Sequence, residues 1–334
     1  MYNQDEKFMK RALYLSEQLQ NTVLPNPMVG AVIVRDGKVL GEGLHENYGG
    51  KHAEENALIH CRINGYDPAE SEMYVTLEPC SFSNAGKHNG PCTEKIIAAG
   101  IKTVVIARAD PNPLVRGAGI RALRDAGIAV EWAVLEEEAA RLNRIYEVLI
   151  QNKRPYIHLK AAITMDGFIA AADNSSKWIS GPESRKRVME FRRESDAVLV
   201  GRRTFEIDSP SLSVHDEDGQ DLPGPQPEKI VISRNENPEQ SLEEFLLTLR
   251  QRGLFRILVE GGREVFNSFL KAGYWDRLTV FQTPDLLGRG VPFCGDLGIS
   301  GIDGKMVLED RETRISGRDI EIDGYREGFR CLRV

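Results

Sequence analysis

The chain has 334 residues, of which 41% are hydrophobic and 28% are charged, and its formal net charge is -7. A chain of this length is too long for one ordinary hydrophobic core, so we expect two domains. The acidic balance argues against a general nucleic-acid-binding surface, and no apolar run is long enough to span a bilayer.

Helices alternate with strands in the first half of the chain. Apolar spacing and turn signals predict helices over residues 6–20, 52–63, 92–99, 119–126 and 136–149, and strands over residues 29–34, 39–43, 73–77, 103–107 and 128–134. Asp36-Gly37 is typical of a β-hairpin turn. The alternation predicts an α/β domain with a largely parallel sheet.

Residues 151–155 form a short polar linker that ends in Pro155. We place the domain boundary at this linker, which gives a first domain of residues 1–150 and a second of residues 151–334. The second domain is predicted to alternate again and to finish in β-rich segments. Its strands are expected over residues 156–163, 197–200, 229–232, 255–259, 278–282, 305–315 and 319–332, and its helices over 183–193, 242–250 and from Gly262 or Arg263 onward.

One imidazole and two thiols stand out in the first domain. His52 and Cys92 fall in predicted first helical turns, and Cys80 follows a predicted strand. These are ligand types that zinc prefers, and three protein ligands leave a fourth position open. Glu54 lies two residues after the histidine, as does the proton-transferring glutamate of zinc deaminases. We therefore predict a catalytic zinc site for hydrolytic deamination.

Two other interpretations of these residues stay open. A structural zinc site would need a fourth ligand, for which His60, Cys61 and His88 are the candidates. The grouping of buried cysteines could also arise by chance. The two cysteines are further apart than in the usual Pro-Cys-x-x-Cys signature, so the match to zinc deaminases is in kind rather than in spacing.

In the second domain, Glu260-Gly261-Gly262 lies where a buried strand gives way to a helix. Two glycines at such a turn let a phosphate approach backbone N–H groups, although half of such turns are purely structural. The segment is not a Gly-x-Gly-x-x-Gly fingerprint, so a Rossmann domain is not indicated. Trp178 is equally consistent with a nucleotide cleft and with a core aromatic.

Together these motifs resemble the bifunctional deaminase/reductase family of riboflavin biosynthesis over nearly the whole chain. The resemblance is carried by Pro25-Asn26-Pro27-Met28-Val29-Gly30, His52-Ala53-Glu54, Thr76-Leu77-Glu78-Pro79-Cys80, Asp110-Pro111-Asn112-Pro113, Met165-Asp166-Gly167, Ser176-Lys177-Trp178-Ile179, Asp208-Ser209-Pro210-Ser211-Leu212 and Val259-Glu260-Gly261-Gly262. It implies a cytidine-deaminase-like zinc domain followed by a dihydrofolate-reductase-like, NADPH-dependent domain. The implied substrate is a diaminopyrimidine ribotide, deaminated on its ring and then reduced by NADPH from ribosyl to ribityl.

The resemblance also implies roles for individual residues. His52, Cys80 and Cys92 match the zinc ligands, and Glu54 matches the catalytic acid/base. Matches to cofactor contacts are Ala162, Trp178, Thr204, Asp208 and Gly262; matches to substrate contacts are Lys160, Ser176, Arg192, Leu212 and Glu260.

The chain departs from the family pattern at two places. The loop after Cys80 has Phe82 in place of a histidine that contacts the pyrimidine, and His88 is the candidate replacement. His215 stands where the family usually has an arginine that binds substrate phosphate. A histidine is a weaker, pH-dependent partner for phosphate than a guanidinium.

Two alternatives to this function remain open. One is a paralogue that carries out the same chemistries on a related aminopyrimidine nucleotide. The other is a chain in which one half is inactive and serves as a binding module. A cytoplasmic location is expected, because five cysteines, two of them assigned to metal, suggest no disulfide framework. We expect no nucleic-acid or membrane partner, and a homo-oligomer is possible.

Overall fold

The computed structural model describes residues 4–19, 23–81, 90–233 and 240–327. The chain divides after Asn152 into two compact units, which are described separately. None of the helices in these described stretches is long and apolar enough to cross a membrane.

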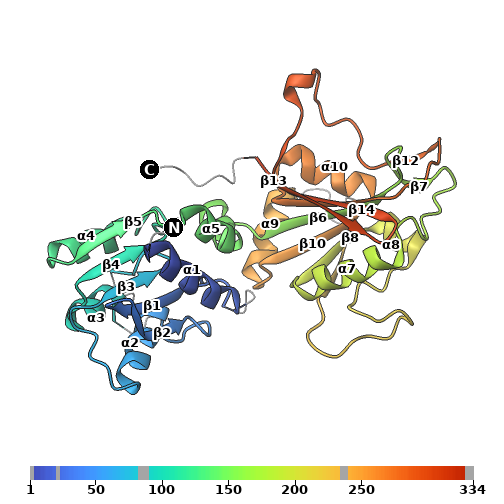
Figure 1. The fold of residues 1–334 in the computed structure, drawn as a ribbon. Coiled ribbons are helices and arrows are strands. Elements are labelled where there is room, and N and C mark those ends of the chain that lie inside the picture. The colour runs from blue at the N-terminus through green and yellow to red at the C-terminus, as the bar shows by residue number, and fades with distance from the viewer. Residues whose placement is uncertain (1–3, 20–22, 82–89, 234–239, 328–334) are drawn as a thin grey trace. The chain divides into compact units, whose positions relative to one another are not determined.

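The first unit is built around a five-stranded sheet with the strand order β2-β1-β3-β4-β5 (Figure 1). Its elements are α1 (Gln4–Glu17), β1 (Gly30–Arg35), β2 (Lys38–Leu44), α2 (Ala53–Ile63), β3 (Glu72–Val75), α3 (Cys92–Ala98), β4 (Thr103–Ile106), α4 (Ala118–Asp125), β5 (Ala129–Trp132), α5 (Glu136–Leu142), α6 (Arg144–Glu147) and the π-helix η1 (Val148–Asn152). Strands β3, β4 and β5 are parallel, whereas β1 pairs antiparallel with both β2 and β3. The sheet is therefore mixed rather than largely parallel.

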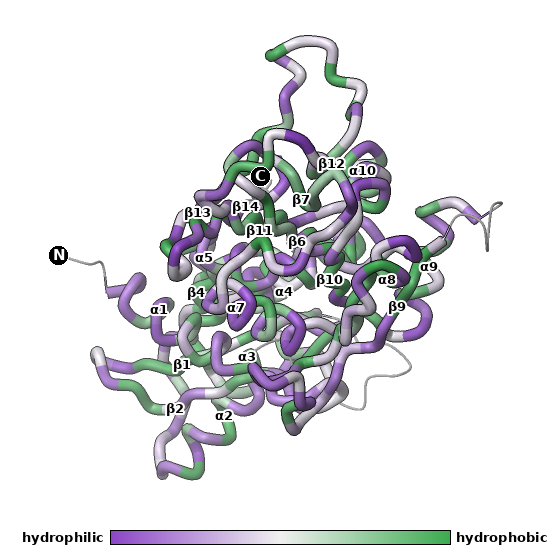
Figure 2. The backbone as a smooth tube through the Cα atoms, turned by 90° about the vertical axis from the view of Figure 1, so that its right-hand side faces the viewer, coloured by the Kyte–Doolittle hydropathy of each residue, from purple (hydrophilic) through white to green (hydrophobic). Residues whose placement is uncertain are grey.

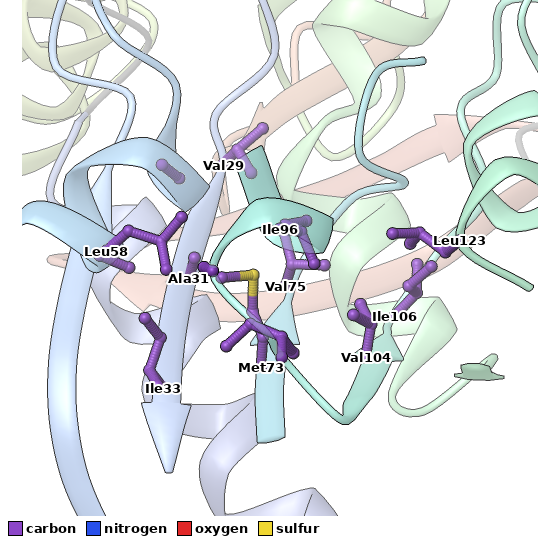
Figure 3. Packing of buried hydrophobic residues seen from close by; sticks show 14 of the residues in the cluster. Val29, Ala31, Ile33, Leu58, Met73, Val75, Ile96, Val104, Ile106 and Leu123 are labelled. Carbon is purple, nitrogen blue, oxygen red and sulfur yellow. The ribbon is translucent and has the colours of Figure 1, made fainter. Parts of the chain in front are cut away.

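Both faces of this sheet are buried, because side chains alternate across each strand. Val32, Val34 and Tyr74 pack with α1 on one face. Ala31, Ile33, Met73, Val75, Val104 and Ile106 point to the other face, where they meet Leu58 of α2, Ile96 of α3 and Leu123 of α4 (Figure 3). The first unit is thus a three-layer α/β/α sandwich.

The single helix predicted over residues 136–149 is wrong, since the structure has α5, α6 and η1 in its place. The break falls at Asn143, which is buried. The Asn143 side chain accepts a hydrogen bond from the Met28 N–H at 2.8 Å and donates to the Met28 carbonyl at 2.9 Å. The helix is interrupted at Asn143, where the side chain makes these hydrogen bonds to the segment before β1. The sequence pattern contained no sign of this long-range contact.

The second unit contains a seven-stranded mixed sheet with the order β13-β14-β11-β6-β10-β8-β9. Its elements are β6 (Tyr156–Ile163), β7 (Phe168–Ala171), α7 (Pro182–Arg193), β8 (Ala197–Gly201), α8 (Arg202–Asp208), β9 (Glu228–Ile232), α9 (Leu242–Gln251), β10 (Arg256–Gly261), α10 (Arg263–Ala272), β11 (Arg277–Gln282), β12 (Gly290–Pro292), the 3-10 helix η2 (Ile302–Gly304), β13 (Leu308–Ser316) and β14 (Asp319–Arg326). The sequence analysis missed α8, β7 and β12. Helix α8 has no buried residue, and β7 and β12 are short and form their own two-stranded sheet.

Helices again cover both faces of the sheet. One face packs against α9 and α10, through Leu246, Leu249, Phe266 and Phe269 among others. The opposite face packs against Val188 and Phe191 of α7. Strands β10 and β11 supply apolar residues to these cores, and Figure 2 colours such hydrophobic residues green along the backbone. Strands β6, β8 and β10 run parallel, so their carboxyl ends lie at one edge of the sheet.

Candidate active sites

The structure brings the three predicted zinc ligands together. His52 is the N-cap of α2, Cys92 is the first residue of α3, and Cys80 lies beyond the end of β3. Their ligand atoms all lie within 4.8 Å of one another. The His52 Nδ1 atom is 3.6 Å from the Cys80 Sγ and 3.2 Å from the Cys92 Sγ.

This donor set fits a zinc ion. Tetrahedral zinc with Zn–S of about 2.3 Å and Zn–N of about 2.0 Å separates nitrogen and sulfur ligands by about 3.5 Å, close to the distances found here. The pKa of the Cys92 thiol is raised above its usual value. The main cause is its hydrogen bond to Cys80, and the second cause is its burial. A cation between the two sulfurs would reverse that effect, because coordination deprotonates a thiol.

Glu54 lies beside this cluster, in the first turn of α2, and its side chain is buried. Burial raises the pKa of Glu54, and the nearby His52 opposes that shift. A carboxyl group whose pKa is raised above its usual value is suited to general acid–base catalysis, because its pKa lies closer to the operating pH.

No described His, Cys, Asp or Glu joins the three ligands as a fourth member of the cluster. Of the candidates, His60 accepts a hydrogen bond from the backbone of Glu42, and Cys61 is buried in the core. His88, together with Phe82, lies outside the described residues. The described residues therefore give a three-ligand set, as in catalytic zinc sites rather than structural ones.

The sequence analysis did not single out His45, which the structure places next to His52. The two rings are 5.3 Å apart in an edge-to-face arrangement. His45 is buried. Its Nε2 atom is 3.0 Å from the side-chain nitrogen of Asn26, and its Nδ1 atom is 3.0 Å from the Lys51 carbonyl oxygen. Burial lowers the pKa of His45. Its position directly after β2 was the available signal, because polar residues at strand ends often line sites.

In the second unit, most of the predicted residues line one open cavity of about 2460 Å³ at the carboxyl ends of β6, β8 and β10. The residues that line it are Lys160, Ala162, Ser176, Trp178, Arg192, Thr204, Asp208, His215, Glu260 and Gly262. Pockets for a single drug-sized ligand are usually about 300–1,000 Å³. The cavity is therefore larger than a pocket for one such ligand.

Gly262 and Thr204 lie against each other on the cavity wall. Gly262 has φ +85° and caps α10, and a Cβ added to it would lie 2.5 Å from the Thr204 Oγ1. The absence of a side chain at this helix start keeps backbone N–H groups accessible to an anion.

Arg192, Glu260 and Lys160 form a charged cluster in the cavity. The Arg192 guanidinium donates to both Glu260 oxygens, at 2.5 and 2.9 Å, and to the Ser213 carbonyl at 2.8 Å. Burial would raise the pKa of Glu260, but Arg192 holds it below its usual value. Burial lowers the pKa of Lys160, and Glu260 opposes that shift. The cluster thus presents a carboxylate beside an amine in the cavity wall.

Ser176, Asp208 and Trp178 lie on a second part of the wall. The Ser176 hydroxyl donates to an Asp208 oxygen at 2.9 Å. Trp178 is 68% exposed, with the Arg185 guanidinium 4.8 Å from its ring, so it is not a core aromatic.

Leu212 differs from the other predicted residues. Its side chain is fully buried with Val188 and Phe191, and it does not line the cavity. Its φ of +56° is unusual for a residue other than glycine. Only backbone atoms of Leu212 are therefore available for the substrate contact that the resemblance implies.

The cluster of His52, Cys80 and Cys92 beside a buried glutamate, followed by a second unit with a mixed sheet and a large cavity, is the arrangement expected of a zinc-type deaminase joined to a reductase. The family model described as the cytidine and deoxycytidylate deaminase zinc-binding region matches residues 2–108, and the RibD C-terminal domain matches residues 155–322. The chain belongs to the RibD family of bifunctional riboflavin-biosynthesis proteins. The predicted fold class, a cytidine-deaminase-like domain followed by a reductase domain, is confirmed.

Individual relatives cover almost the whole chain. The riboflavin biosynthesis protein RibD of Aquifex aeolicus is 38% identical, over 95% of this chain and 97% of that protein. RibD of Escherichia coli is 34% identical, over 95% and 98%. Among solved structures, Acinetobacter baumannii RibD has a TM-score of 0.80 at 31% identity, with coverage of 97% and 99%. A Thermotoga maritima diaminohydroxyphosphoribosylaminopyrimidine deaminase/5-amino-6-(5-phosphoribosylamino)uracil reductase has a TM-score of 0.80 at 34% identity, with the same coverage.

Proposed function

We propose that the first unit hydrolytically deaminates 2,5-diamino-6-(5-phosphoribosylamino)pyrimidin-4(3H)-one and that the second unit reduces the ribosyl group of the product with NADPH. The observation that supports this proposal most strongly is the convergence of His52, Cys80 and Cys92 beside the buried Glu54. The relative from Thermotoga maritima is named for these two activities.

In the proposed deamination, His52, Cys80 and Cys92 hold zinc. When bound, zinc supplies the Lewis acidity that activates water at neutral pH. The Glu54 carboxylate takes the proton that water loses and delivers it to the ring nitrogen. It then takes the proton of the hydroxyl group that has been added to the ring carbon and delivers it to the amino group, which leaves as ammonia while the carbonyl forms. Burial of Glu54 supports this role, because it favours the protonated form between the two transfers.

In the proposed reduction, the protein mainly positions its ligands, because NADPH supplies the hydride. The contacts assigned to NADPH are Ala162, Trp178, Thr204, Asp208 and Gly262, and those assigned to the ribotide are Lys160, Ser176, Arg192, Leu212, His215 and Glu260. The Lys160 ammonium and the Glu260 carboxylate, which face the same cavity, are suited to orient ribose hydroxyls and to move a proton to the ribose oxygen.

The experiment that tests the proposal is turnover of the purified protein on the diaminopyrimidine ribotide, with and without NADPH, followed by mass spectrometry. Replacement of one amino group by oxygen is expected without NADPH, and a further gain of two hydrogens is expected with it. A product that stops at deamination would mean that the second unit only binds ligands. No turnover of this ribotide, but turnover of a related aminopyrimidine nucleotide, would identify a paralogue with another substrate.

Gly262→Ala is expected to raise the KM for NADPH by about tenfold, because the new Cβ would lie 2.5 Å from the Thr204 Oγ1 and close the approach to α10. Deamination should not change. Gly253→Ala is the matched control, since Gly253 also has a positive φ, of +80°, but has nothing within 4 Å of the added Cβ. Equal effects of the two substitutions on the KM would place the cofactor elsewhere.

His215 is expected to make ribotide binding in the reduction step depend on pH. The Asp216 carbonyl lies 2.8 Å from the His215 Nδ1 and so holds a proton on that atom. Nε2 then donates a hydrogen bond to phosphate only when the ring is protonated. The KM for the ribotide should therefore rise as the pH is raised.

His215→Arg should flatten this dependence and lower the KM at the higher pH, because a guanidinium stays charged. If His215→Ala leaves the KM and its pH profile unchanged, the phosphate is bound by other groups, for which Arg192 and Lys160, two cationic residues of the same cavity, are the candidates.

The cytoplasmic location and a homo-oligomeric state also remain predictions. Size-exclusion chromatography with light scattering tests the second of these directly.

A further inference from the structure

The buried carboxylate of Glu78 is not used by either proposed reaction, although it lies two residues before Cys80. It accepts four backbone hydrogen bonds from the segment that follows β4. Oε2 accepts from the N–H groups of Asp110 at 3.1 Å and Gly117 at 2.9 Å, and Oε1 from those of Gly119 at 2.8 Å and Ile120 at 3.3 Å. Two of these donors belong to the first turn of α4, where a negative charge is favoured.

The same two segments also touch through their backbones. The Glu78 N–H donates to the Arg108 carbonyl at 2.9 Å. A Cβ added to Gly119 would lie only 2.0 Å from the Pro79 carbonyl oxygen, so α4 packs directly on the residue before Cys80. Residues 78–80 and residues 110–120 therefore form one tightly joined unit, which we term the Glu78 hub.

The loop within this hub carries polar groups at the sheet edge where Cys80 emerges. The Asp110 side chain accepts hydrogen bonds from the Asn112 N–H at 2.8 Å and from the Tyr146 hydroxyl at 3.3 Å. Ligands of α/β proteins bind outside the carboxyl ends of strands, and β3 and β4 are parallel neighbours that end here. The loop is thus placed to contact a substrate whose ring lies at the His52–Cys80–Cys92 cluster.

We propose that Glu78 is a positioning residue for deamination, which fixes the loop of residues 110–117 against the Pro79–Cys80 segment and so presets the substrate site. The inference rests on the proposed deaminase function. Glu78 acts on the substrate only through the loop of residues 110–117. Loss of the Glu78 carboxylate should therefore weaken substrate binding more than it slows the chemical step. The zinc ligands and Glu54 do not hydrogen-bond to the Glu78 carboxylate in the described residues.

Glu78→Gln tests this proposal, because it keeps the shape but replaces one acceptor oxygen by an NH₂ group that faces two backbone donors. The KM for deamination should rise at least tenfold, with kcat changed less than threefold and zinc content and reductase activity retained. In the full-length protein as purified, hydrogen exchange at the amides of Asp110, Gly117, Gly119 and Ile120 should accelerate at least tenfold, while exchange in β1 stays unchanged. Glu131→Gln, at an exposed position on β5, is the control with the same charge change.

Gly119→Ala gives a second, independent test, since it separates α4 from Pro79 and leaves the carboxylate intact. It should reproduce the rise in KM. Unchanged exchange at the four amides in Glu78→Gln, or a fall in kcat without a rise in KM, would overturn the proposal. Loss of zinc from Glu78→Gln would also overturn it, because Glu78 would then support the metal ligands rather than the substrate loop. If the unmodified protein does not deaminate the ribotide, the proposed function fails, whereas the exchange measurement still reports on the hub.

Discussion

Replacement of Glu54 by glutamine is expected to slow deamination by about two to four orders of magnitude, the range for a positioned acid/base group, while zinc stays bound. The glutamine side chain has nearly the same shape, so α2 and the position of His52 should not change. It cannot take a proton from water or give one to the leaving amine. The measurement is kcat for the ribotide together with zinc content by atomic absorption.

Glu94→Gln is the matched control for this substitution. Glu94 is exposed in the first turn of α3, so its substitution removes one negative charge near Cys92 without touching the buried site. Its kcat should stay within about twofold of the unmodified protein. Loss of zinc from Glu54→Gln would instead assign Glu54 a ligand or structural role, and full activity would exclude it from proton transfer.

Cys92→Ser is expected to remove both zinc and deamination. The unmodified protein should hold about one zinc per chain, as a three-ligand open site implies. A serine hydroxyl is a poor zinc ligand at neutral pH, and two remaining ligands do not make a stable site. Reduction of the supplied deaminated ribotide by NADPH should continue at the normal rate, because the cavity belongs to the other compact unit.

Cys61→Ser is the control for the loss of a thiol in the same unit. Cys61 is buried, and its Sγ lies 3.6 Å from the Tyr66 carbonyl, a hydrogen bond that a serine hydroxyl can also make. This variant should keep its zinc. A Cys92→Ser protein that kept full zinc and full deamination would show that the ligand assignment is wrong.

Short-range patterns were sufficient to predict most helices and strands. Helical spacing located α1 and α2, and apolar runs bounded by turn signals located β1 and β6, all to within a few residues, because burial requires apolar residues at those positions. The patterns failed where a distant contact or weak burial decides local structure. The break at Asn143 depends on Met28, which is far away in the sequence. Helix α8 buries no side chain and so left no periodic signal.

The sequence alone supplied the ligand types and the His-x-Glu spacing that are typical of a zinc deaminase, because both are local properties, but it left a structural zinc site and a chance grouping open. It also indicated a Gly261-Gly262 turn of the kind that admits a phosphate, whereas the close fit of Gly262 against Thr204 came from the tertiary structure. Whether the ligands meet was decided by tertiary structure, since His52, Cys80 and Cys92 come from three different elements.

Tertiary structure also decided the surroundings of both sites. It paired Arg192 with Glu260, buried the Leu212 side chain, and placed His45 beside His52. Above all, it joined Glu78 to residues 110–120, a contact between segments more than thirty positions apart. Such contacts depend on which strands become neighbours in the sheet, and residue spacing along one chain carries no record of that pairing.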